Sequence, residues 1–239
     1  MWIEGRGVIH ILSAGAAKAV VEKLAARFTA KRGVDIAPVF GAVGAMLEKL
    51  DAGAACDAII LTAAQIDALA KAGRVVSATA RPMGTVFTGL AVRATDRQPD
   101  AANADDLRAA LLAADGIFFP DALKATAGIH FAKVLDRLGI ADKVNSRLFT
   151  YPSGALAMRA MAESTLPVVL GCTQVTEILY TSGVALVTRL PKAFELATVY
   201  SVAVCERSAT NQLAIDFAAL LGGDESAALR VDAGFEAVI

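Results

Sequence analysis

The sequence predicts an α/β protein built from two lobes. The chain has 239 residues, which is long for one domain of roughly 100 to 150 residues. Short apolar runs alternate with segments of helical spacing, which is typical of β-α units whose parallel strands are buried on both faces. Hydrophobic residues make up 56% of the chain, which is enough for two modest cores.

The first third of the chain repeats one pattern: an apolar run, a loop of small residues, and a segment with helical spacing. Three such β-loop-α units predict a parallel sheet with right-handed crossovers. The loops then lie at the carboxyl edge of the sheet, where open α/β folds bind ligands. Gly33 is expected to end the first helix. The expected strands are residues 8–12, 34–40 and 57–61, and the expected helices are residues 17–32, 45–50 and 64–72.

The pattern changes after Arg74, because residues 85–94 form a long strand-like stretch with no helix before it. We interpret this stretch as a crossover into a second lobe. A closing helix at residues 211–221, with Leu213, Phe217 and Leu220 inward, is expected to return to the first lobe. Lobe one is therefore predicted to comprise residues 7–82 and 201–239, and lobe two residues 83–200. Further helices are expected at residues 107–114, 127–138, 154–163 and 175–180. Further strands are expected at residues 116–119, 147–151, 167–171, 184–190 and 197–205.

Composition excludes several classes of function. A net charge of −1 with no basic, aromatic-rich cluster argues against nucleic acid as a partner. The apolar runs are far shorter than the roughly 20 residues of a spanning helix, so no membrane insertion is expected. Two histidines and three cysteines without CxxC or HxxxH spacing predict neither a metal site nor a disulfide framework. No cofactor motif is present.

The N-terminus shows no basic region followed by a long apolar segment, so it predicts no secretory signal. The opening letters MWIEGRG contain IEGR, which resembles an engineered protease site, and residues 1–6 are therefore left out of the fold argument. Two locations stay open: the protein is periplasmic if a signal peptide has been removed, and otherwise cytoplasmic.

Several stretches, in their order and spacing, resemble the molybdate-type periplasmic solute-binding proteins. They are IHILSAGA, GVDIAPVFGAVGAMLEKLDAGAACDAIIL, FFPDALKATAGIHFAKVLDRLG, GCTQVTEI and LATVYSVAV, and the resemblance runs from about Gly7 to the C-terminus. It implies the two-lobed periplasmic-binding-protein type 2 fold, or Venus flytrap, with a ligand cleft between the lobes and two hinge strands. It also implies a small anionic ligand and an ABC transporter permease as partner.

The resemblance assigns positions to the oxyanion site. In the family, serine hydroxyls and backbone amides of lobe one, and amides and a tyrosine of lobe two, hold the oxyanion. The two serine positions correspond to Ala16 and Val43, the lobe-two amide to Ala127, and the tyrosine to Thr173. The hydroxyl donors have therefore changed, which argues against molybdate as the ligand.

Three loops are expected to present backbone amides at helix N-termini, where an anion meets unpaired N–H groups and the positive end of the helix dipole. Lys124 precedes one of them and is suited to pair with a carboxylate. Ser153 is expected to cap its helix, while Thr173 and Gln174 follow a buried strand. The predicted ligand-binding residues are Ser13, Ala14, Gly15, Ala16, Val43, Gly44, Lys124, Thr126, Ala127, Gly128, Ser153, Thr173 and Gln174.

Four functions remain open. The first is reversible binding of a di- or tricarboxylate by lobe closure, and the second is ordinary oxyanion transport of the molybdate type. Aconitate isomerases, which shift a double bond between cis- and trans-aconitate, resemble members of the same superfamily and suggest a cofactor-independent isomerase as a third. The groups able to move a proton are His130, Tyr151, Cys172 and Glu177, and no catalytic residue is assigned. Of these, His130 is expected to be structural. A further alternative for the function of the protein is to sense a ligand as the partner of a cytoplasmic regulator.

Overall fold

The computed structural model describes residues 7–238, whose contacts divide the chain into two compact units. Unit 1 contains residues 7–40, 46–85 and 198–238, and unit 2 contains Gly41–Ala45 and Val86–Ala197. The chain passes between the units within β4 (Arg81–Arg93) and within β9 (Ala197–Val204). The IEGR letters at residues 3–6 lie outside the described residues.

Unit 1 contains a mixed sheet in the strand order β2-β1-β3-β9. Strands β1 (Val8–Ala14) and β3 (Ala58–Thr62) are parallel, as the repeated β-α units predict, whereas β9 is antiparallel to β3. Strand β2 comprises Asp35–Gly41. Residues 59–61 of β3 are fully buried, which explains their uninterrupted Ile-Ile-Leu sequence.

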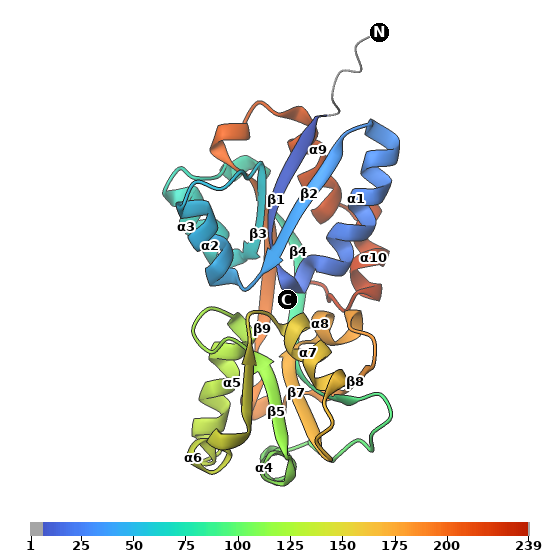
Figure 1. Cartoon of the computed structure of the whole chain (residues 1–239). Helices are drawn as coiled ribbons and strands as arrows, with labels where there is room; N and C mark the ends of the chain where they lie inside the picture. The colour runs from blue at the N-terminus through green and yellow to red at the C-terminus, as the bar shows by residue number, and fades with distance from the viewer. Residues whose placement is uncertain (1–6, 239) are drawn as a thin grey trace. The chain divides into compact units, whose positions relative to one another are not determined.

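Helices flank the sheet of unit 1 (Figure 1). Helices α2 (Val43–Asp51) and α3 (Ala63–Lys71) are on one side of the view, and α1 (Lys18–Arg32), α9 (Gln212–Gly222) and α10 (Ala227–Asp232) on the other. The rings of Phe28 on α1 and Phe217 on α9 meet edge to face at 5.1 Å. Gly33, with φ of 69°, ends α1 in the left-handed conformation expected of a helix-terminating glycine.

Unit 2 contains strands in the order β4-β7-β5-β6, with β8 (Val184–Arg189) also paired to β4. Strands β5 (Gly116–Pro120), β6 (Leu148–Tyr151) and β7 (Val169–Gln174) are parallel, and β4 is antiparallel to β7 and β8. The helices of this unit are α4 (Ala104–Ala113), α5 (Thr126–Arg137), α6 (Ala141–Val144), α7 (Gly154–Glu163) and α8 (Val175–Tyr180).

Alternating residues of the same strands enter two different cores of unit 2. On β5, Ile117 and Phe119 pack in a core with Phe131 of α5, whereas Phe118 packs with Met158 of α7. Strand β7 alternates in the same way, since Leu170 enters the first core and the preceding Val169 the second. Side chains of a strand point alternately to opposite faces, so one apolar run covers two layers of helices.

Several elements differ from the sequence prediction. Helix α2 begins at Val43, two residues before the expected start, because the small residues there are compatible with helix as well as loop. Strand β7 extends through Gln174 rather than ending at Gly171. On α9 the buried residues are Ala214, Phe217, Ala218 and Leu221, so the stripe is rotated away from Leu213 and Leu220. Helices α6 and α10 are short and were not predicted.

No helix among residues 7–238 combines the length and apolarity of a membrane-spanning segment.

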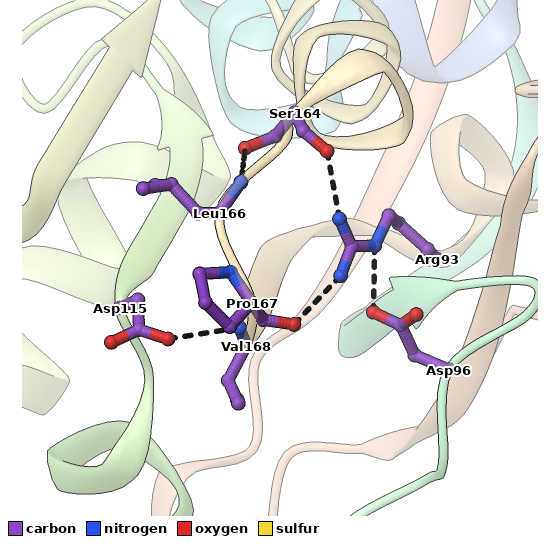
Figure 2. Close-up of polar contacts among 7 residues, drawn as sticks. All are labelled: Arg93, Asp96, Asp115, Ser164, Leu166, Pro167 and Val168. Atoms are coloured by element: carbon purple, nitrogen blue, oxygen red, sulfur yellow. Dashed lines mark hydrogen bonds and ion pairs between the residues drawn. The ribbon is translucent and has the colours of Figure 1, made fainter.

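Arg93, at the end of β4, holds the connection between α7 and β7 in place (Figure 2). Its guanidinium donates to the carbonyl oxygens of Ser164 at 2.7 Å and Pro167 at 2.8 Å, and its Nε lies 2.7 Å from the Asp96 carboxylate. Asp115 accepts a hydrogen bond from the Val168 amide at 2.9 Å. A segment without regular secondary structure thus has its backbone polar groups satisfied by side chains.

We expect Arg93→Ala to lower the melting temperature, because it leaves two backbone carbonyls without their donors. The cost is about 1–3 kcal/mol, equivalent to roughly 3–8 °C for a chain of this size. Thermal unfolding followed by circular dichroism measures the shift. Arg97→Ala, at an exposed position of the same segment, is the control and is expected to change stability by less than about 0.5 kcal/mol; equal shifts for both variants would contradict this role of Arg93.

Candidate functional site

The β1-to-α1 junction presents backbone amides without a side-chain cap. Ser13 and Ala14 belong to β1 rather than to the expected loop, and Gly15–Ala17 form one 3₁₀ turn before α1. No side chain caps either helical segment. Ser13 is fully buried, and its hydroxyl donates to the Ala14 carbonyl at 3.0 Å. The polar groups that this junction offers are therefore those of its backbone.

The predicted second loop, residues 42–45, lies within the segment Gly41–Ala45 that belongs to unit 2. The amide of Gly44 donates to the carbonyl oxygen of Lys124 at 3.0 Å. A Cβ at position 44 would lie 3.2 Å from the Cα and carbonyl oxygen of Lys124, so a glycine permits this close backbone approach. Val43 is buried in the first turn of α2.

The turn before α5 is shaped by Asp121. Its Oδ1 accepts hydrogen bonds from the amides of Leu123 at 2.7 Å and Lys124 at 2.9 Å, which is an Asx-type turn. Helix α5 then begins at Thr126, one residue earlier than expected, and no side chain caps it. Gly128 packs against the carbonyls of Pro120 and Asp121, where a Cβ would overlap with both.

A pocket of about 400 Å³ lies beside this turn. It brings the predicted Lys124 together with Tyr151, whose ring stacks on Phe118 at 6.1 Å between centroids. The stacking fixes the Tyr151 ring, while its hydroxyl remains a proton donor or acceptor. The lining residues are Ala42, Ala45, Asp121, Lys124, Thr150, Tyr151 and Pro152.

The N-terminus of α7 already contacts a side chain of the protein itself, the carboxyl group of Glu177. Thr173 donates its hydroxyl to Glu177 Oε2 at 2.6 Å, and the amide of Ala155 donates to Oε1 at 3.3 Å. Ser153 caps the same helix by accepting from the Leu156 amide at 3.4 Å, as the sequence predicts. Gly154 leaves the room for this arrangement, because a Cβ there would overlap with Thr173 and Glu177.

Burial raises the pKa of Glu177, and the hydrogen bonds from Thr173 and the backbone amides oppose this effect. Glu177 lies in the first turn of α8, and its carboxyl group also accepts from the amide of Ala155 in the first turn of α7. A carboxylate at a helix N-terminus is favoured by the dipole and by the unpaired amides. The only sequence signal for this contact is a glycine after the cap serine, which is too common to identify it.

The remaining titratable candidates have structural surroundings. His130 Nε2 lies 2.7 Å from the carbonyl oxygen of Phe194. Cys172 is fully buried, and desolvation raises the pKa of its thiol well above the usual value. No group of three or more His, Cys, Asp or Glu suited to a metal ion occurs in the described part of the chain.

The predicted ligand-binding residues are divided between the two units. Ser13, Ala14, Gly15 and Ala16 belong to unit 1, and the other nine belong to unit 2. Within unit 2 the contacts join Gly44 to Lys124, and Thr173 to the start of α7 after Ser153. Thr173 and Gln174 are buried within β7, not in the loop expected after it. That all thirteen serve one ligand stays a prediction.

We expect Thr173→Val to destabilise the protein by about 1.5–3 kcal/mol at pH 8, because the Glu177 carboxylate loses a hydroxyl donor. The folded state binds the Glu177 proton more tightly than the unfolded chain does. The contribution of this carboxyl group to stability therefore falls as the pH rises from the ordinary pKa of a glutamate through the raised pKa of the folded state. The cost of Thr173→Val therefore grows over the same window and is smaller at pH 4. Urea unfolding at both pH values measures it.

Thr176→Val is the matched control. The Thr176 hydroxyl is equally buried, but it has no hydrogen-bond partner among the described residues. Its replacement by an isosteric methyl is expected to be neutral or slightly stabilising at both pH values. A loss at position 173 that does not change with pH would contradict the assignment of this hydroxyl to the charged form of Glu177.

Comparison with known proteins identifies the family. A model described as "Bacterial extracellular solute-binding protein" matches residues 9–236. An aconitate isomerase of Pseudomonas is 24% identical, with 96% of this chain and 88% of that protein covered.

Solved structures share the fold. The periplasmic molybdate-binding protein of Azotobacter vinelandii superposes with a TM-score of 0.76 at 17% identity, covering 95% of this chain and 98% of that one. The sulfate-binding protein SubI of Mycobacterium tuberculosis gives 0.75 at 21% identity, covering 98% and 88%. The predicted periplasmic-binding-protein type 2 fold is thereby confirmed. Since the family model spans nearly the whole chain, this protein belongs to the bacterial extracellular solute-binding proteins.

Proposed function

We propose that this solute-binding protein binds a small di- or tricarboxylate, and that α1 in unit 1 and α5 in unit 2 each offer backbone amides at their N-termini. Residues 7–82 with 201–239, and residues 83–200, would act as its two lobes. An ABC transporter permease is the proposed recipient of the ligand, as the family resemblance implies.

The observation that carries this proposal is the distribution of helix caps. Helices α3, α4, α7 and α9 are capped by the side chains of Thr62, Asn103, Ser153 and Asn211. Helices α1 and α5, the two longest, have no side-chain cap, and neither do the short helices α6, α8 and α10. Uncapped N-termini retain N–H groups and a positive dipole end for an external anion. Helices α1 and α5 combine this feature with the greatest length and begin at loops that the sequence singles out.

The donors around these termini suit carboxylates better than a tetrahedral oxyanion. Ala16 and Val43 have no hydroxyl, and the Ser13 hydroxyl already donates to a carbonyl. Buried oxyanion oxygens without donors cost on the order of 1–3 kcal/mol each. In contrast, the ammonium of Lys124, beside the start of α5, can form a charge-assisted hydrogen bond with an extended acid.

The second candidate is a cofactor-independent isomerase of an unsaturated carboxylate. The relative named aconitate isomerase supports it, as does Tyr151, which lines the same pocket as Lys124. Such a reaction needs a base to remove a proton at one carbon and an acid to return one at another. Tyr151 can take part in either step, with Lys124 holding a carboxylate.

We expect calorimetric titration to give tighter binding of citrate or trans-aconitate than of molybdate, by a factor of roughly one hundred. The loss of the two hydroxyl donors accounts for the difference. Lys124→Met should weaken carboxylate binding by about tenfold or more, because one charge-assisted hydrogen bond is lost.

Lys133→Met is the control, since Lys133 is exposed on α5 and does not line the pocket. It removes the same charge and is expected to leave carboxylate affinity unchanged. Submicromolar molybdate binding with no heat from either acid would refute the carboxylate proposal and favour ordinary oxyanion transport.

The isomerase candidate predicts that the protein converts trans-aconitate to the cis isomer without added metal or cofactor, and that Tyr151→Phe slows the conversion at least about hundredfold. The absorbance or proton spectrum of the mixture over time measures the reaction. Binding of trans-aconitate without conversion above buffer would eliminate the isomerase and leave the binding function.

A further inference from the structure

Two of the three cysteines, distant in sequence, meet in unit 1. The sulfur atoms of Cys56 and Cys205 lie 3.3 Å apart although 149 positions separate them in the chain. Both side chains are buried. Cys172, the third, is buried in unit 2. The sequence spacing alone indicated no pair, because the contact depends on the pairing of β3 with β9.

Backbone pairing keeps the two thiols adjacent. Cys56 lies two positions before β3 and Cys205 directly follows β9, with Ala58 and Val204 paired in the antiparallel register. The Cys205 amide donates to the Asp57 carbonyl at 2.8 Å. The Asp57 carboxylate in turn accepts from the His10 amide at 2.7 Å and from the Ser208 hydroxyl at 2.6 Å. Both strand ends are thus held by bonds that do not involve the sulfurs.

The two cysteines differ in their position relative to a surface pocket. Cys205 lines a pocket of about 310 Å³, whereas Cys56 does not line it. Arg74 and Arg207 line the pocket together with Asp51 and Glu206, and Arg74 is paired with Asp51 at 3.0 Å. The two guanidinium groups lower the pKa of Cys205 and so favour negative charge on its sulfur.

We propose that Cys56 and Cys205 are a redox-active pair that forms an intramolecular disulfide by exchange with a small external disulfide. An S–S bond of roughly 2.05 Å requires the sulfurs to approach by only about 1.2 Å from their 3.3 Å separation. This proposal is independent of the ligand and of the proposed binding site.

The exchange proceeds in two balanced steps. The Cys205 thiolate attacks one sulfur of the external disulfide, breaks its S–S bond and releases one thiolate, leaving a mixed disulfide on Cys205. Cys56 then gives its proton to the released thiolate and attacks the Cys205 sulfur, expelling the second external thiolate, which takes a proton from water. The two cysteines are oxidised by two electrons, and the external disulfide is reduced to two thiols.

The electrostatics assign the order of attack. The hydrogen bond between the two sulfurs lowers the pKa of Cys205, and Arg207 and Arg74 act in the same direction against burial and Asp57. The bond with Cys205 and burial raise the pKa of Cys56. Cys205 is therefore the attacking residue and Cys56 the resolving one.

The experiment equilibrates the reduced, full-length protein with oxidised glutathione, blocks remaining thiols by alkylation and maps tryptic peptides. We expect a linked peptide pair, residues 50–71 with residues 193–207, and a fall in free thiols from three to one per chain. Cys172→Ser should retain this linkage. The oxidised form should melt on the order of 10 °C higher, because the link closes a long loop of the unfolded chain.

Single variants test the order of attack. Cys56→Ser should stop at a glutathione adduct on Cys205, and Cys205→Ser should form neither the adduct nor the link. The proposal is overturned if folded wild-type protein, verified by circular dichroism, keeps three alkylatable thiols or accumulates the adduct without the linked peptides. An adduct on Cys56 instead of Cys205 would overturn the assigned order.

Discussion

Burial of the sheet in unit 2 on both faces is the constraint that governs the arrangement of its helices. Since Ile117 and Phe119 enter one core and Phe118 the other, neither layer of helices can be removed without exposing alternate residues of the same strand. The strands must then be joined through helices that cross one face or the other, and their carboxyl ends lead directly into helix N-termini. Both α5 and α7 begin in this way, shortly after β5 and β6.

These helix starts are used differently. Helix α7 has Ser153 as its cap and the Glu177 carboxylate on its first amides, whereas α5 has only a backbone turn organised by Asp121 before it. Both helix starts have unpaired amides at the positive end of a dipole. Side chains of the fold satisfy amides at the start of α7, whereas no side chain caps α5. This contrast is the main physical support for the proposed site.

Sequence reasoning recovered the order of most elements, because buried strands and amphipathic helices leave apolar patterns of different period. It placed the start of α2 two residues late and ended β7 three residues early. The reason is that the sequence does not reveal which residues Val43, Thr173 and Gln174 contact in the folded chain. Long-range contacts such as Thr173 with Glu177, or Cys56 with Cys205, depend on register and strand order. Neither register nor strand order is encoded in a local pattern.

Under the proposed function, the position of the Glu177 carboxyl group has a consequence for how an acid would orient itself. Unit 2 already places this group at the start of α7, so its attraction for a polycarboxylate would come mainly from α5 and the neighbouring Lys124. An acid with several carboxylates would therefore be drawn by one end, and an ionised Glu177 would turn its other charges away from α7 by like-charge repulsion. The fold would thus impose polarity on a nearly symmetric molecule before any side chain contacts its central carbons.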